Sequence, residues 1–130
     1  MALIRYVLAG LLAAGAARAA PPMLSEVEGH NRVALMFSPA SDDPRFTQET
    51  SQLATLTAHP AFQSVVVVGV ADGTVIGLSD NPSALRARFG VPANDFRFVL
   101  LGKNGQVSLS QGSVVTRDRI AQVIQAMPPP

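Results

Sequence analysis

The sequence predicts an α/β domain with a four-stranded mixed sheet and helices on both of its faces. Three observations support this fold class. An apolar run at 33–37 leads directly into helix-start residues, the run at 64–70 contains four consecutive valines, and an Asn-Gly pair at 104–105 separates two strand-like segments. Such runs are typical of strands buried on both faces, and Asn-Gly is typical of a hairpin turn. The predicted order is strand, helix, strand, helix, two hairpin strands and helix.

The first 19 residues have the features of a secretory signal peptide. Arg5 precedes an apolar segment at 7–17, which is too short to span a bilayer, and small residues at 17 and 19 fit an A-x-A cleavage pattern. We expect cleavage after Ala19 and a periplasmic or secreted location. The alternative is an uncleaved N-terminal anchor.

After cleavage the chain would consist of a lead-in at 20–31, one domain at 32–127 and a proline-rich tail at 128–130. Two of the ten basic residues, Arg5 and Arg18, would leave with the leader, so eight basic residues would remain with nine acidic ones. A nearly neutral chain without tryptophan offers neither a basic patch nor a stacking platform for bases. We therefore expect no nucleic-acid partner, and no stable membrane anchor after cleavage.

Cysteine is absent from the whole chain. A domain of about 110 residues can bury roughly two-thirds of its unfolded surface, so it does not need disulfides. Without a thiolate the chain cannot perform disulfide exchange. The two histidines lack metal-ligand spacing. We therefore expect no metal and no other cofactor.

The first half of the domain is predicted to form a strand, a helix and a second strand. Arg32 to Phe37 is the first strand. Asp43 and Pro44 are typical of the N-cap and first position of a helix, which should continue to about Thr57 with Phe46, Thr50, Leu53, Ala54 and Thr57 on its inner face. The strand at 64–70 has no polar alternation, which indicates a parallel neighbour to the first strand.

The second half begins with the least predictable segment, 71–79, where Asp72-Gly73 forms a turn. Asn81 and Pro82 then begin a short helix that Gly90 ends. Strands at 96–101 and 106–111 follow, and polar alternation places the second of them at a sheet edge. The last helix begins after Thr116, with Ile120, Val123, Ile124 and Met127 on its core face.

This order resembles the thioredoxin fold. In that comparison Asp42-Asp43-Pro44-Arg45 stands where the family has Cys-x-Pro-Cys, so the proline is retained and both thiols are replaced. The position of the family's cis-proline holds Phe96 or Arg97. The resemblance implies a thioredoxin-like fold without the family's redox chemistry.

Four segments together carry a closer resemblance: the strand at 32–39 with its Phe-Ser-Pro end, Asp43 to Gln48, the hairpin at 100–107, and Met127-Pro128. In these segments the chain resembles a family of exported bacterial domains of unknown function, related to the thioredoxin-like domain of animal sushi-repeat-containing extracellular matrix proteins. The resemblance implies a thioredoxin-like or peroxiredoxin-like fold and names no reaction.

Five residues form the predicted site: Ser41, Asp42, Asp43, Arg45 and Arg97. The two aspartates could act as an acid/base pair or bind a hard metal, but a helix cap and a solvated loop charge explain them better. Arg97 is a charge within an apolar strand, and buried charges are normally paired. We hypothesise that it reaches Asp42, Asp43 or the helix N-terminus, either as a structural salt bridge or, with Ser41, as an anion pocket.

Two function classes remain open. The first is an exported, non-catalytic module that binds a protein, matrix or envelope partner through the half-exposed last strand or the helix-start surface. The second is a non-thiol enzyme or anion-binding protein that uses Asp42, Asp43 and Arg97. The lack of cysteine favours the first class, and the sequence does not identify the partner or the oligomeric state.

Overall fold

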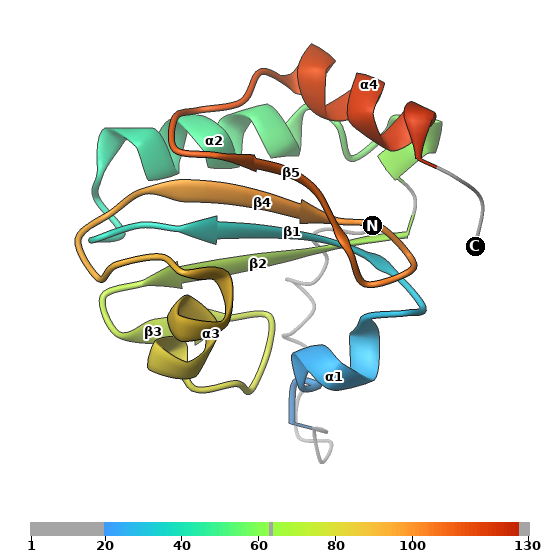
Figure 1. The fold of residues 1–130 in the computed structure, drawn as a ribbon. Coiled ribbons are helices and arrows are strands. Elements are labelled where there is room, and N and C mark those ends of the chain that lie inside the picture. The colour runs from blue at the N-terminus through green and yellow to red at the C-terminus, as the bar shows by residue number, and fades with distance from the viewer. Residues whose placement is uncertain (1–19, 63, 128–130) are drawn as a thin grey trace, which may run out of the picture.

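The computed structural model describes residues 20–62 and 64–127, which form a five-stranded mixed sheet between two pairs of helices (Figure 1). The leader predicted at 1–19 and the tail at 128–130 lie outside the described residues. The strand order across the sheet is β3-β2-β1-β4-β5. The elements are α1 (Leu24–Val27), β1 (Arg32–Phe37), α2 (Pro44–Ala54), the 3-10 turn η1 (Pro60–Phe62), β2 (Val65–Ala71), β3 (Thr74–Ile76), α3 (Pro82–Phe89), β4 (Arg97–Leu101), β5 (Val107–Gln111) and α4 (Arg117–Ala126).

The centre of the sheet agrees with the prediction. β1 pairs in parallel with β2, with Leu35 opposite Val68, and antiparallel with β4, with Leu35 opposite Val99. β5 pairs antiparallel with β4 and lies at the edge of the sheet, as its polar alternation predicted. The α/β class with a thioredoxin-like order of elements is therefore confirmed.

The predicted count of four strands is wrong, because β3 adds a fifth at the opposite edge. β3 pairs antiparallel with β2 through a two-residue turn in which Asp72 and Gly73 both have positive φ, 54° and 69°. Two positive φ angles suit the twist of a tight hairpin, and Asp-Gly is a favoured sequence for it. Sequence analysis identified the turn but missed a strand of only three residues.

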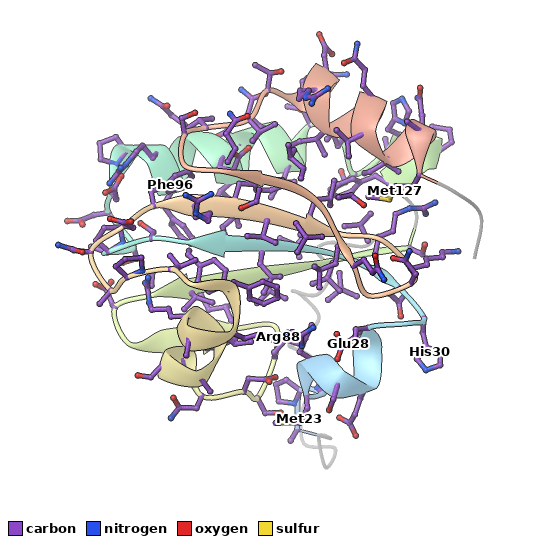
Figure 2. The ribbon with its side chains drawn as sticks, in the orientation of Figure 1. Met23, Glu28, His30, Arg88, Phe96 and Met127 are labelled. Carbon is purple, nitrogen blue, oxygen red and sulfur yellow. The ribbon has the colours of Figure 1, made fainter. Side chains whose placement is uncertain are left out.

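The lead-in contributes to the core through α1. Leu24 and Val27 of this short helix are buried, with exposed fractions of 1% and 7%. The Leu24 amide donates to Asp80 Oδ1 at 2.7 Å. Glu28, which follows α1, pairs with Arg88 of α3 at 2.6 Å, and Figure 2 shows the two side chains pointing toward one another. The segment before β1 is thus attached to α3 and to the loop that precedes it.

Two apolar clusters cover the two faces of the sheet. α1 and α3 lie on one face, and α2 and α4 on the other (Figure 1). Successive residues of a strand point to opposite faces, so Val99 belongs to the α1/α3 cluster and Phe98 to the α2/α4 cluster. This alternation decides which side chains can reach α2.

Local signals placed the helix ends well. Asp43, Asn81 and Thr116 are the N-caps of α2, α3 and α4, and each side chain accepts a hydrogen bond from a first-turn amide. Gly90 ends α3 in the left-handed conformation, with φ of 67°. α2 ends at Ala54 rather than near Thr57, because the Thr57 amide bonds to the Ala54 carbonyl in a tighter turn.

The predicted inner face of α2 needs correction. Glu49 and Leu53 are the buried residues of the helix, and Leu56 just beyond it is also buried. Thr50, Ala54 and Thr57, which were placed on that face, are exposed. The helix is therefore rotated so that a carboxylic acid, rather than a threonine, enters the core.

Among the helices of the described residues, none has the length and hydropathy needed to cross a membrane.

Candidate functional site

The loop from Ser38 to Asp43 joins β1 to α2 at the carboxyl end of the parallel strands. Ser38 is fully buried. Its amide donates to the Val70 carbonyl at 2.9 Å, and its Oγ donates to the Ala40 carbonyl at 2.8 Å. Hydrogen bonds of this kind fix a loop because they satisfy polar groups that water cannot reach. The loop therefore begins in a defined conformation.

Arg86 of α3 holds the same loop from the α3 side. Its Nη2 donates to the Ser38 carbonyl at 2.6 Å and its Nη1 to the Pro92 carbonyl at 2.9 Å. The guanidinium carbon lies 5.8 Å from the centroid of the Phe37 ring. Partial burial lowers the pKa of Arg86, but a guanidinium stays charged at any physiological pH. One side chain thus connects the end of β1, α3 and the segment before β4.

Asp72, in the turn between β2 and β3, holds the middle of the loop. Its Oδ2 accepts a hydrogen bond from the Ser41 amide at 2.9 Å. Hydrogen bonding by the Ser41 side chain, and then by the Ser41 amide, lowers the pKa of Asp72, because these donors stabilise the ionised carboxylate. Ser41 therefore has as its partner an acid that sequence analysis had assigned only to a turn.

Asp43 and Arg45 form a closed pair at the start of α2. Asp43 Oδ1 accepts from the Arg45 amide at 2.9 Å, and the two Asp43 oxygens accept from Arg45 Nε and Nη2 at 2.9 and 2.7 Å. The side-chain hydrogen bond from Arg45 lowers the pKa of Asp43 to about 2. The guanidinium carbon of Arg45 also lies 5.3 Å from the centroid of the Phe96 ring. Asp43 is thus both the predicted helix cap and the partner of a neighbouring arginine.

Arg97 does not join this group, and the hypothesis that it reaches Asp42, Asp43 or the helix N-terminus is wrong. Its Nη1 donates to Ser110 Oγ of β5 at 2.9 Å. The physical reason is the alternation of β4: Arg97 lies on the same face as Val99, toward α1 and α3, whereas α2 covers the other face. Asp42 is exposed to solvent.

The arrangement limits the chemistry of the loop. The Asp43 carboxylate is held by Arg45 and the Asp72 carboxylate by Ser41, so neither is positioned as a general base. Within the described ranges, no three histidine, aspartate or glutamate side chains are grouped closely enough to hold a metal ion. The structure brings together Ser41, Asp43 and Arg45 from the predicted site, and it adds Asp72 and Arg86, which sequence analysis missed.

A buried acid lies on the inner face of α2. Glu49 has an exposed fraction of 0%. Its Oε1 accepts from the Val115 amide at 2.6 Å, while its Oε2 is buried without a hydrogen-bond partner among the described residues. Burial raises the pKa of Glu49 to about 7. The spacing of Phe46, Glu49 and Leu53 along one helical face was the sequence signal that could have identified it.

Comparisons with known proteins agree with the architecture. A family model described as "Domain of unknown function (DUF4174)" matches residues 23–129. The crystal structure of StoA from Bacillus subtilis superimposes with a TM-score of 0.54 at 16% identity, over 74% of this chain and 83% of that one. At this identity the similarity concerns the fold alone. A search of the curated proteins found no match.

Proposed function

The chain belongs to the DUF4174 family of domains of unknown function, and from that premise we propose that it is an exported, non-catalytic binding module with a thioredoxin-like fold. Its partner is a protein or an envelope component that presents an extended segment. The segment docks on the outer edge of β5 by adding a strand to the sheet.

The state of the loop after β1 supports a non-catalytic function. The position that resembles a Cys-x-Pro-Cys motif holds Asp42-Asp43-Pro44-Arg45, and the chain has no cysteine. The Asp43 and Arg45 side chains are bonded to each other. The alternative, a non-thiol enzyme or an anion site, requires Arg97 to converge with these acids, and Arg97 is engaged by Ser110 instead.

The proposal rests on β5, which is an uncharged strand at the edge of the sheet. It is the last strand in the sheet order, so its outer backbone groups have no strand partner within the described part of the chain. Natural edge strands are commonly protected by charges or proline, and Val107 to Gln111 contains neither. Val107 is 52% exposed. An uncharged edge with an exposed β-branched residue suits an extended polypeptide.

The proposed export is based on the N-terminal leader, residues 1–19. Arg5, the apolar segment at 7–17 and the small residues before position 20 have the pattern of a cleavable signal peptide. The resemblance to exported bacterial domains and to extracellular matrix proteins points the same way. An envelope location would bring β5 into contact with periplasmic or secreted polypeptides rather than with nucleic acid.

The test uses a display library of extended peptides, selected on the purified domain. The variant Val107→Lys places a charge on the β5 edge, and Ile76→Lys is its matched control, since Ile76 is 64% exposed on the opposite edge strand β3. We expect selected peptides to bind the wild type and Ile76→Lys and to bind Val107→Lys at least tenfold more weakly. Bound peptide should also slow hydrogen exchange of β5 amides.

Two results would contradict the β5 proposal. Equal binding to both lysine variants would show that the edge of β5 is not the docking site. Loss of binding only in Ile76→Lys would move the site to β3. Circular dichroism of each variant establishes that the fold is intact before binding is compared.

A further inference from the structure

Two side chains of α2 accept hydrogen bonds from the backbone on either side of Thr116, the N-cap of α4. Glu49 Oε1 accepts from the Val115 amide at 2.6 Å, and Gln52 Oε1 accepts from the Arg117 amide at 2.7 Å. We refer to Glu49 and Gln52 as the clasp. The two acceptors are three residues apart on α2, which places them on one side of the helix. The clasp therefore attaches the β5–α4 connection, residues 112–116, to a helix more than 60 positions earlier in the chain.

The two members of the clasp differ in their surroundings. Gln52 is half-buried, so water can reach it. Glu49 is fully buried, and Val115, which it contacts, belongs to the apolar cluster that includes Leu53, Phe98 and Ile120. Its Oε2 has no hydrogen-bond partner among the described residues. A buried carboxylate with one oxygen unsatisfied is costly, whereas the neutral acid is tolerated.

The charged side chains on the neighbouring elements have partners other than Glu49. On α2, Arg45 pairs with Asp43; on α4, Arg117 lies 3.8 Å from Asp118. On the strands, Arg32 of β1 donates to the sulfur of Met127, while Arg97 of β4 lies on the opposite face of the sheet and donates to Ser110. His59, next to η1, and Arg119, which is exposed on α4, are two further titratable groups on this side. Burial raises the pKa of Glu49, and the hydrogen bond from the Val115 amide offsets part of that rise.

We propose that the protonation state of Glu49 controls this attachment. Protonated Glu49 keeps residues 112–116 against α2. Loss of the proton releases these residues, so that water reaches the carboxylate. The rest of the sheet stays folded, because the released segment lies outside every strand. Gln52 has no titratable group and holds Arg117 equally at all pH values.

Proton linkage gives the direction in which pH changes the opening of residues 112–116. In the closed form burial raises the pKa of Glu49 to about 7, and in the open form the acid returns to its ordinary value of 4.5. The open form therefore holds fewer protons between these values, and the opening constant rises up to about tenfold per pH unit across that window. Above about pH 7 Glu49 is ionised in both the closed and the open form, so the opening constant no longer changes with pH.

The test is hydrogen exchange of the Val115 and Arg117 amides between pH 4.5 and 8.5, corrected for intrinsic exchange rates, in three chains. We expect protection of Val115 in the wild type to fall with pH up to about 7 and then stay constant. Glu49→Gln, which keeps an acceptor but cannot ionise, should show no such slope. Gln52→Ala should lower the protection of these amides by a factor that is the same at every pH, and the pH dependence at Val115 should stay as steep as in the wild type. His59 is present in all three chains, so it cannot account for a difference between them.

Three results would overturn the proposal. One is a Val115 profile in Glu49→Gln that parallels the wild type. Another is equal pH-dependent loss of protection at Leu35 of β1, which would mean that the whole domain opens. The third is independent of any variant: a carbon-13 titration of the Glu49 carboxyl in the wild type with a midpoint near 4.5 instead of near 7.

Discussion

The amide of Ser41 donates to the Asp72 carboxylate at 2.9 Å, across 31 positions of sequence. Ser41 lies in the loop that follows β1, and Asp72 lies in the turn that follows β2. Because β1 and β2 are parallel neighbours, their carboxyl ends meet at one edge of the sheet. This single contact therefore joins the two loops that parallel pairing brings together.

The first prediction concerns Asp72. Asp72→Ala removes the acceptor for Ser41 and places alanine at a φ of 54°, which asparagine and aspartate tolerate better. Asp72→Asn keeps both an acceptor oxygen and that tolerance. We expect Asp72→Ala to unfold at a lower temperature than Asp72→Asn at pH 7, measured by circular dichroism. Equal midpoints for the two variants would contradict the role given to this contact.

The same contact predicts an acid dependence. The pKa of Asp72 is lowered in the folded chain, so its contribution to stability is present above its ordinary pKa of 3.8 and is lost as pH falls through the folded value. The wild type should therefore lose more of its thermal midpoint between pH 5 and pH 2.5 than Asp72→Asn does. Matching acid profiles would mean that the carboxylate form adds nothing.

The second prediction compares two arginines of α3. Arg86→Ala leaves the buried Ser38 carbonyl without its donor, which should lower the free energy of unfolding by about 1–3 kcal/mol. Arg88→Ala is the matched control, because Arg88 pairs with Glu28 at the surface and its loss should cost less than about 1 kcal/mol. Urea denaturation measures both. A larger effect at Arg88 would show that the contact to Ser38 is not the stronger one.

The third prediction concerns Gly77, which follows β3. It has a φ of +102°, and a Cβ at this position would lie 2.8 Å from the Val67 carbonyl oxygen. Gly77→Ala combines strained backbone with a steric clash, so it should lower the free energy of unfolding by about 2 kcal/mol or more. Gly90→Ala, with φ of +67° and open space around the added carbon, should cost only about 1 kcal/mol. Chemical denaturation of the two variants tests this order.

The fourth prediction applies the Glu49 titration to the whole domain. The folded pKa is raised, so the folded state holds more protons than the unfolded state between pH 4.5 and about 7. Stability should fall across that window by up to about 3 kcal/mol, and local opening would reduce this amount. Glu49→Gln should lack the fall, as measured by urea midpoints at each pH. Stability of the wild type that rises from pH 5 to 7 relative to Glu49→Gln would contradict the prediction.

Much of the fold could be predicted because its signals are local. Asp43 with Pro44, and Asn81 with Pro82, begin helices where predicted, since a cap depends only on the first turn that it closes. The valine run at 65–68 predicted the parallel neighbour of β1, because a strand without polar alternation needs cover on both faces. β3 was missed because a three-residue strand has too few side chains to show a period.

The site was predicted only where its contacts are local. The sequence by itself determined the Asp43 cap and the absence of thiol chemistry, since the first depends on adjacent residues and the second on composition. Only the tertiary structure decided that Arg97 bonds to Ser110, that Arg86 holds Ser38, and that Glu49 is buried against Val115. The physical reason is that strand register and helix rotation determine which face a side chain occupies and what covers it there. Register and rotation in turn depend on packing between segments distant in the chain.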